Sequence, residues 1–177
     1  MLMPVPAVMV SCSDKDIKPN IITLAWVGTV CSEPPILSVS IRPSRHSFGI
    51  IEKTGELVVN VPSLKQAKAT DLCGVISGRD KDKFKEAGLT PAPAIKLQCP
   101  IIAECPINIE CKVIKRIELG THVMYLAEVV AVQVTTSLLR KNKLEIEKAG
   151  LFAYAHGNYH ELGRLIGHFG FSVRKKK

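Results

Sequence analysis

The chain has 177 residues, of which 46% are hydrophobic and 23% are charged, and its formal net charge is +8. This composition excludes a disordered chain, a collagen-like repeat and a coiled coil, and the length fits a single domain over residues 1–177. No stretch approaches the roughly 18 uninterrupted apolar residues of a membrane span. The apolar start Met1–Val10 holds two prolines and no basic residue, unlike a signal peptide. The sequence therefore predicts a cytoplasmic protein without a membrane partner.

The positive charge favours an anionic partner, such as a phosphorylated small molecule or a nucleic acid. Aromatic residues make up only 5% of the chain, and no basic stretch is interleaved with them. This pattern argues against nucleic-acid binding. The six cysteines form no CxxC pair. We interpret them as reduced, buried small hydrophobic residues rather than as a metal site or a disulfide framework.

The first half of the chain predicts strands joined by short helices. Apolar, β-branched runs indicate strands at Val5–Ser11, Asn20–Val30, Ile36–Arg42 and Leu57–Val61. In Ile36–Arg42, strict alternation places Ile36, Ser38, Ser40 and Arg42 on one face. Helices are expected at Ser44–Lys53, with Ser44 as N-cap, at Leu64–Leu72 and at Lys83–Ala87.

The second half predicts further strands, at Ile101–Cys105, Asn108–Ile117 and His122–Val134, with a hairpin turn at Glu118–Thr121. Leu138–Lys148 is expected to be a loop or a frayed helix. The six or seven strands mostly follow one another directly rather than alternating with helices. This order favours a mainly β fold, an antiparallel barrel with helical insertions, over a doubly wound parallel sheet.

The strongest candidate for an anion site is the strand-to-helix junction Ser40–Ser47. A helix start attracts phosphate through its free N–H groups, and Arg42 and Arg45 add donors in a forked geometry. An ordinary capped helix with solvated arginines explains the same residues equally well. The dinucleotide fingerprint GxGxxG, the P-loop, the GxSxG elbow and the HExxH motif are all absent. An anion is therefore expected to be held in some other way.

Three other segments are weaker candidates. Asn20–Thr29 could offer a flat edge to a planar ring, although its Trp26 also suits a core position. Ser77–Lys83 places a glycine among charged residues, as in a phosphate loop or in solvated surface. His122, and His156 with Tyr159 and His160, are either site residues or structural ones.

Several motifs, in this order and spacing, resemble the flavin reductase-like, FMN-binding split-barrel proteins, and within them the flavoredoxin-like branch. The matching segments are NIITLAWV at 20–27, EPPI at 33–36, SVSIRPSRHS at 38–47, ELVVNVP at 56–62, SGRDKDKF at 77–84, GLT at 88–90, PII at 100–102, ECKV at 110–113 and GTHVMYLAEV at 120–129. Together they extend the resemblance over nearly the whole chain, from about Pro4 to Gly167.

The resemblance implies a homodimer of six-stranded antiparallel split barrels, each binding FMN, with FAD a less favoured cofactor. Residues implied along the flavin edge are Asn20, Thr23, Leu24, Ala25, Trp26 and Thr29. Residues implied at the phosphate are Ser40, Arg42, Arg45, His46 and Ser47, with Ser77, Gly78 and Lys83 approaching from a nearby loop. His122 is implied as the catalytic residue on the nicotinamide side, and His156 and Tyr159 as a cover for the ring.

The function implied is that of an oxidoreductase. Electrons would pass from NAD(P)H or a small redox protein through FMN to a flavin, a ferric complex or a protein acceptor. The alternative is an FMN-binding electron-transfer protein without NAD(P)H activity of its own. A basic barrel that binds nucleic acid is the third hypothesis, and the scarcity of aromatic residues disfavours it.

Overall fold

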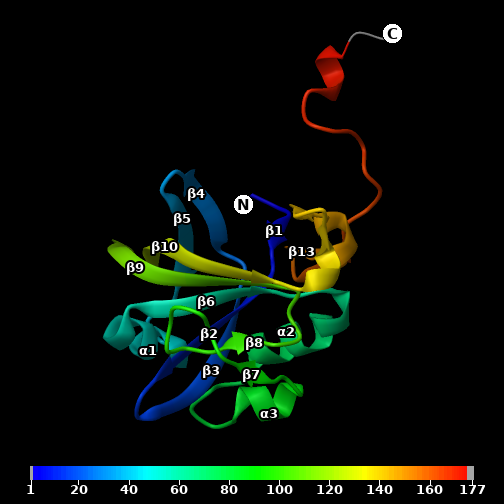
Figure 1. Cartoon of the computed structure of the whole chain (residues 1–177). Coiled ribbons are helices and arrows are strands. Elements are labelled where there is room, and N and C mark those ends of the chain that lie inside the picture. Colours follow the sequence, from blue (N-terminus) through cyan, green and yellow to red (C-terminus); the bar gives the residue numbers. More distant parts are fainter. Residues whose placement is uncertain (1, 175–177) are drawn as a thin grey trace.

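The computed structural model describes residues 2–174, and antiparallel strands dominate it (Figure 1). The strands are β1 (Val5–Pro6), β2 (Val8–Asp14), β3 (Ile17–Leu24), β4 (Val27–Ser32), β5 (Pro35–Ile41), β6 (Glu56–Val61), β7 (Pro91–Ala92), β8 (Ile101–Ile102), β9 (Ile107–Leu119), β10 (His122–Val134), β11 (Leu139–Arg140), β12 (Lys143–Leu144), β13 (Phe152–Ala155) and β14 (Asn158–Glu161). The helices are α1 (His46–Thr54), α2 (Ala67–Val75) and α3 (Lys83–Ala87), with 3-10 turns at Leu64–Gln66, Thr136–Leu138, Ile146–Ala149 and Phe171–Val173.

The main sheet has seven strands in the order β3-β2-β6-β9-β10-β5-β4, and all its pairs are antiparallel. It confirms the mainly β, antiparallel class, but the predicted count of six strands is wrong for this sheet. The single strand expected at Asn20–Val30 bends at Ala25 and Trp26 and becomes β3 and β4. At the bend, the amide of Ser40 in β5 donates to the carbonyl of Trp26 at 2.9 Å. This bond holds the bend against β5.

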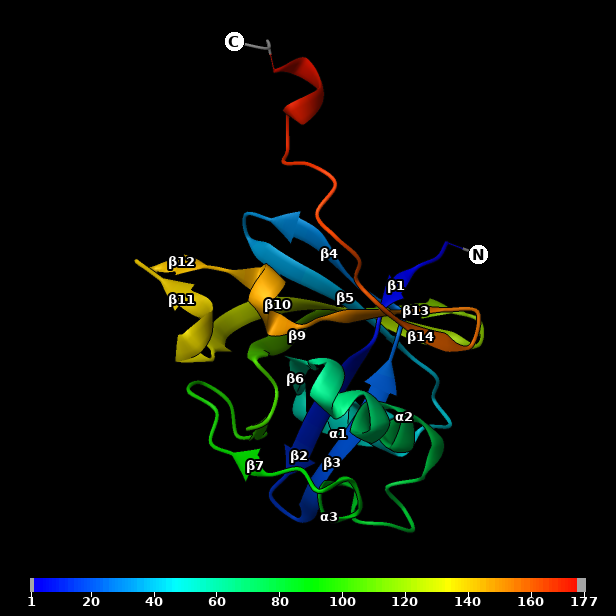
Figure 2. The ribbon, with the colours of Figure 1, turned by 90° about the vertical axis from the view of Figure 1, so that its right-hand side faces the viewer.

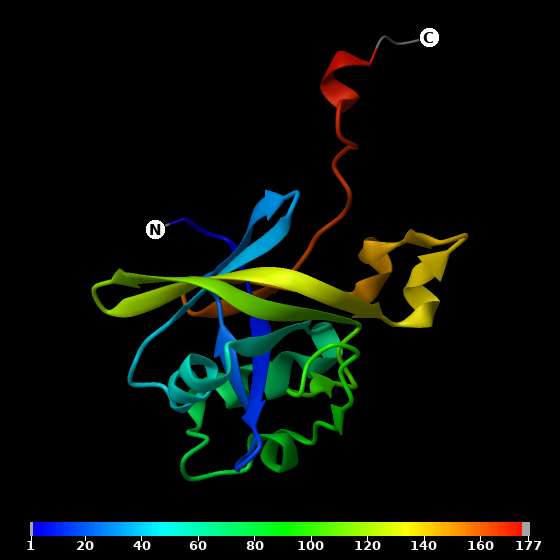
Figure 3. The ribbon, with the colours of Figure 1, turned by 60° about the vertical axis from the view of Figure 1, so that its left-hand side comes forward.

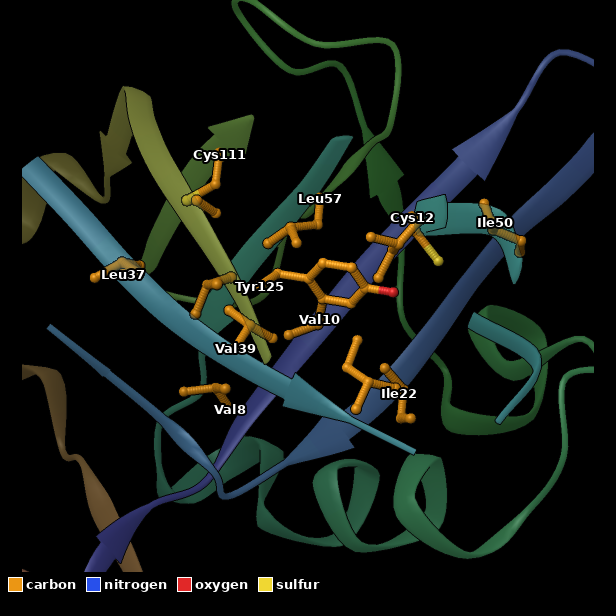
Figure 4. Close-up of a cluster of buried hydrophobic side chains, with 14 of the residues drawn as sticks. Val8, Val10, Cys12, Ile22, Leu37, Val39, Ile50, Leu57, Cys111 and Tyr125 are labelled. Atoms are coloured by element: carbon orange, nitrogen blue, oxygen red, sulfur yellow. The ribbon is translucent and has the colours of Figure 1, made fainter. Parts of the chain in front are cut away.

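The core lies between the strands of this sheet and α1, and it is built from the alternating apolar faces. Leu37, Val39 and Ile41 of β5 are buried, as the alternation predicts. Figure 4 shows the ring of Tyr125 among Val10, Val39 and Leu57. Only 1% of the Tyr125 surface is exposed, and its hydroxyl donates to Glu52 on α1. Burial of this kind contributes about 25 cal/mol per Å² of apolar surface, and here it fixes α1 to the sheet.

The start of α1 differs from the prediction that Ser44 caps the helix. The N-cap is Arg45, which is extended (φ −77°, ψ 140°) and makes no side-chain cap bond. The amide of Arg45 donates to the carbonyl of Arg42 at 3.0 Å, so residues 42–45 form a turn that leads into the helix. Ser44 therefore lies inside the turn. The helix ends as predicted, with Gly55 in the left-handed region at φ 65°.

The remaining elements surround the main sheet. Helices α1 and α2 contact β2 and β3, and α3 contacts β3 (Figure 1). Strands β13 and β14 form a hairpin that pairs with β1, next to α2 in Figure 2. Residues 139–144 form a second small hairpin, β11–β12, where a loop or a frayed helix was expected. Beyond β14, residues 162–174 lead away from the body of the molecule (Figure 3).

Candidate functional site

A cavity of about 440 Å³ opens beside the bend between β3 and β4. Its lining comes from the end of β3 and the bend itself, from α2 and from the β13–β14 hairpin. Ser40 of β5, Arg42 directly after β5 and His122 of β10 complete the lining. The residues that line it are Ala7, Ile22, Thr23, Leu24, Ala25, Trp26, Ser40, Arg42, Arg45, Asp71, Gly74, Val75, His122, Tyr154, Gly157 and Tyr159. We call this the larger cavity.

A second cavity of about 170 Å³ lies between the start of α1 and the loop after α2, and we call it the smaller cavity. Its lining residues are Asn20, Ile22, Ser44, Arg45, His46, Ser47, Gly74, Ile76, Ser77, Gly78, Arg79 and Lys83. Three of these, Ile22, Arg45 and Gly74, line both cavities. The two cavities therefore adjoin, with Arg45 between them.

The smaller cavity is electropositive. Arg45, Arg79 and Lys83 line it, and none of them forms an ion pair with a carboxylate among residues 2–174. Lys83 is only 5% exposed, and its ammonium donates to the carbonyl of Cys73 at 2.7 Å. Burial lowers the pKa of Lys83, and the charge of Arg45 lowers it further. Burying a cation without a counter-ion costs free energy. An anion bound here would compensate the charge and remove that cost.

Neutral donors and acceptors complete the smaller cavity. The amide nitrogen of Asn20 donates to the hydroxyl of Ser47 at 2.7 Å, and both side chains are buried. Burial, with the nearby Arg79 and Lys83, lowers the pKa of His46, so its ring is held neutral. Gly78 approaches so closely that a β-carbon there would lie 2.9 Å from the ring of His46 and closer still to the amide oxygen of Asn20. Only glycine fits at this position.

The structure brings together most of the residues that the sequence singles out. The larger cavity receives Thr23, Leu24, Ala25, Trp26, Ser40, Arg42, Arg45, His122 and Tyr159. The smaller cavity receives Asn20, Arg45, His46, Ser47, Ser77, Gly78 and Lys83. Three candidates lie outside both. Thr29 is exposed on β4, opposite Leu37, His156 is exposed in the turn between β13 and β14, and His160 is exposed on β14.

Several lining residues were not predicted. Asp71, Gly74 and Val75 come from α2, and Tyr154 and Gly157 come from the β13–β14 hairpin. Ile76 joins the smaller cavity. Ser44 and Arg79 line it too, and both lie within the candidate segments Ser40–Ser47 and Ser77–Lys83. No local pattern shows that one face of α2 meets β3 across the bend.

Comparisons with known proteins show the family to which this chain belongs. The family described as "Flavin reductase like domain" matches residues 1–163. The chain belongs to the flavin reductase-like family. Among solved structures, the flavoredoxin of Desulfovibrio vulgaris (Miyazaki F) is 32% identical with a TM-score of 0.91, covering 98% of this chain and 95% of that one. The flavoredoxin of Methanosarcina acetivorans is 28% identical with a TM-score of 0.89, over the same shares. The resemblance of the motifs to this family is thus confirmed.

The sequence match to one curated relative covers a smaller share of the chain than these structural matches do. An uncharacterized protein of Archaeoglobus fulgidus is 36% identical over 115 residues, which are 65% of this chain and 65% of that protein. The aligned segment therefore spans less than two thirds of that relative's length. The split-barrel fold is shared along nearly the whole chain, whereas the close sequence match is confined to part of it.

In this flavin reductase-like chain, aromatic contacts join the two strands of the β13–β14 hairpin, and one hydrogen bond joins the hairpin to α2 beside the larger cavity. The ring of Tyr159 meets Phe152 and Tyr154 edge-on, with centroids 5.7 Å and 5.6 Å apart. Its hydroxyl donates to Asp71 on α2 at 3.2 Å. Burial, with the nearby Asp71, raises the pKa of Tyr159 to about 12, so the hydroxyl keeps its proton at neutral pH. The hydrogen bond connects the hairpin to α2.

Replacing Tyr159 with phenylalanine is expected to loosen this hairpin. The lost bond contributes about 0.5–1.5 kcal/mol, so amide hydrogen exchange in β13 and β14 should accelerate about 2- to 10-fold. Tyr154→Phe is the matched control, because the Tyr154 hydroxyl has no hydrogen-bond partner among residues 2–174. Equal acceleration in both variants would show that the Asp71 bond does not hold the hairpin.

The interpretation of the cysteines as buried apolar residues is confirmed for five of the six. All six are free thiols, and five of them are buried, with Cys31 half-exposed on β4. Burial raises the pKa of Cys12, Cys105 and Cys111 to about 12 and that of Cys73 to about 11.

Among residues 2–174 no cluster of three or more metal-binding side chains occurs. No helix in that range is long and apolar enough to cross a membrane.

Proposed function

We propose that the chain binds FMN, with the flavin ring in the larger cavity and the phosphate in the smaller one. The observation that carries this proposal is the pair of adjoining cavities that share Arg45. The larger one offers Trp26 and the backbone of the bend to a planar ring. The smaller one offers three unpaired cations and hydroxyl groups to a dianion. FMN joins those two chemical parts in one molecule.

The residues present fit the phosphate group. Ser44, Ser47 and Ser77 supply hydroxyl donors, and Arg45 and Arg79 supply guanidinium donors. Gly78 keeps open the space that a β-carbon would fill. Lys83 stands buried beneath this space as an uncompensated charge. These features describe an anion site built on the strand-to-helix junction that the sequence singles out.

We propose that the activity is electron transfer through this flavin. When bound, FMN supplies hydride and single-electron chemistry that no side chain provides. The protein residues would bind and orient it: Arg45 would hold its charged end, and Trp26 would contact its planar end. Tyr159 of the hairpin also lines the larger cavity. The proposed electron donor is NAD(P)H or a small redox protein, and the proposed acceptor is a flavin, a ferric complex or a protein.

The decisive experiment is an absorption spectrum of the protein after mixing with FMN and desalting, followed by anaerobic additions of NADH and NADPH. A retained flavin band that bleaches is expected for a reductase, and it names the donor. A retained band that stays yellow identifies a carrier that another protein reduces. A chain that retains no flavin, and shows no turnover with free flavin, contradicts the proposal.

Replacing Arg45 with alanine is expected to weaken FMN binding by about 1.5–3 kcal/mol, the usual contribution of a hydrogen bond to a charged group. This corresponds to about a 10- to 150-fold rise in Kd, measured by equilibrium dialysis. Arg164→Ala removes the same charge from the exposed segment that follows β14, and it should leave Kd unchanged. An unchanged Kd in Arg45→Ala would mean that the phosphate lies elsewhere.

A further inference from the structure

Two arginines line the larger cavity, and only one of them also lines the smaller cavity. Arg45 borders both, whereas Arg42 borders the larger cavity alone. Arg42 has no carboxylate partner among residues 2–174. FMN carries a single phosphate group, and the smaller cavity already provides it with Arg45, Arg79 and Lys83. The charge of Arg42 is therefore left without a use in flavin binding.

The position of Arg42 is fixed by a neighbouring strand. In the pairing of β5 with β10, Ile41 lies opposite Val123. The next residues outward, Arg42 and His122, therefore leave the sheet side by side. The Nε atom of Arg42 lies 3.4 Å from Nε2 of His122, at the long end of the hydrogen-bonding range. The other ring nitrogen, Nδ1, lies 3.0 Å from the hydroxyl of Thr121.

The direction of these hydrogen bonds follows from the chemistry of the guanidinium group. Arginine can only donate, so Nε2 of His122 must accept. The proton of the neutral ring is then on Nδ1, and this N–H group can donate a hydrogen bond to the hydroxyl of Thr121. In this arrangement Nε2 carries no proton to give to a ligand in the cavity. Its lone pair instead orients Arg42, whose two terminal nitrogens keep their donors unpaired among residues 2–174.

We propose that Arg42, oriented by His122, binds the negatively charged group of a second ligand in the larger cavity beside the flavin. The chemical class is a small organic anion with a phosphate or carboxylate group, which a planar guanidinium binds through two parallel hydrogen bonds. This inference rests on the proposed function, because the second ligand would exchange electrons with the flavin. His122 is then a positioning residue, and the earlier expectation that it is catalytic is revised.

The test uses FMN-loaded protein, so that the smaller cavity is filled. Inorganic pyrophosphate and citrate serve as probes, one for each kind of anion. Calorimetric titration measures their Kd, and the ring-nitrogen NMR signals of His122 report binding at this place. Wild-type protein is expected to bind at least one probe with a shift of the His122 signals, and Arg42→Gln is expected to raise that Kd at least tenfold. The control Arg164→Gln should bind as wild type does.

Substitutions of His122 separate positioning from proton transfer. The side-chain oxygen of glutamine can accept the bond from Arg42, whereas leucine cannot. His122→Gln should therefore keep the probe Kd within about threefold of wild type, and His122→Leu should match Arg42→Gln. Equal losses in the glutamine and leucine variants would overturn the positioning role. Absence of probe binding to the loaded wild type, or equal binding by Arg42→Gln, would overturn the anion site.

Flavin retention distinguishes this inference from the proposed function. FMN affinity should change by less than threefold in Arg42→Gln. A larger loss of affinity would indicate that Arg42 binds the flavin phosphate, and it would overturn the inference. A wild-type chain that neither retains FMN nor turns over free flavin contradicts the proposed function instead. In that case, titration of the flavin-free protein with the same probes still shows whether the Arg42 site exists. The His122 signals move with the probe if the Arg42 site exists, and they stay in place if it does not.

Discussion

Replacing Gly78 with alanine is expected to raise the Kd for FMN at least tenfold without unfolding the protein. The added β-carbon would lie 2.9 Å from the ring of His46 and would push against the amide of Asn20. Asn20 is buried and bonded to Ser47, so its side chain has nowhere to move without breaking that hydrogen bond. The substitution would therefore distort the wall that faces the phosphate while leaving the core intact. Equilibrium dialysis with FMN measures the effect.

Gly49→Ala provides the matched control. Gly49 lies in α1, and a β-carbon there meets nothing within 4 Å. Alanine in a helix interior is more favourable than glycine by roughly 0.5–1 kcal/mol, so this variant should be slightly more stable and should bind FMN as wild type does. Wild-type affinity in Gly78→Ala would show that the smaller cavity does not hold the phosphate.

Replacing Glu110 with alanine is expected to lower the free energy of unfolding by about 2–4 kcal/mol. The Glu110 carboxylate is fully buried in β9, and it accepts hydrogen bonds from the amides of residues 95–97 and from Gln133. Hydrogen bonds to a charged acceptor contribute about 1.5–3 kcal/mol each. In the variant, water would form hydrogen bonds with the exposed amides and restore part of this free energy. The carboxylate thus anchors the segment before β8. Chemical denaturation measures the loss.

The contribution of Glu110 is also expected to depend on pH. Burial by itself would raise the pKa of Glu110, but the four hydrogen bonds outweigh burial and lower the pKa below its ordinary value of 4.5. A lowered pKa in the folded state means that the stabilisation is present above pH 4.5 and is lost as the pH falls through the folded-state value. The difference between wild type and Glu110→Ala should therefore shrink in acid.

Glu128→Ala is the control for this pair of measurements. Glu128 is exposed on β10, and no hydrogen bond or ion pair involves it among residues 2–174. Its replacement should change the free energy of unfolding by less than about 0.5 kcal/mol at any pH. A Glu110 variant that behaves in the same way would show that the buried carboxylate does not anchor the 95–97 segment.

Much of the fold could be predicted because periodicity reports burial directly. The range His122–Val134 is confirmed as β10, and Lys83–Ala87 as α3. The alternation of β5 correctly separates its buried face from the face that carries Ser40 and Arg42. The anion site stays a prediction. Hydroxyl and guanidinium groups at a strand-to-helix junction favour it, and the structure places Ser44, Arg45 and Ser47 around the smaller cavity.

The errors and omissions arise where distant parts of the chain decide the local structure. The bend at Ala25 and Trp26 depends on a hydrogen bond from Ser40, which no local pattern shows. Ser44 has the right chemistry for an N-cap, but the turn from Arg42 to Arg45 moves the helix start beyond it. Asp71 and Tyr154 line the larger cavity only because α2 and the β13–β14 hairpin both pack around it. Tertiary packing overrides local preference at these places.

The single tryptophan of the chain lies in the wall of the larger cavity. All indole fluorescence of the native protein therefore originates at the bend between β3 and β4. A flavin in the larger cavity would absorb that emission by energy transfer, so the decrease in tryptophan fluorescence would report occupancy without any added label. The same signal would follow displacement of the flavin by a competing ligand in real time. The bend that shapes the cavity thus also carries its own optical probe.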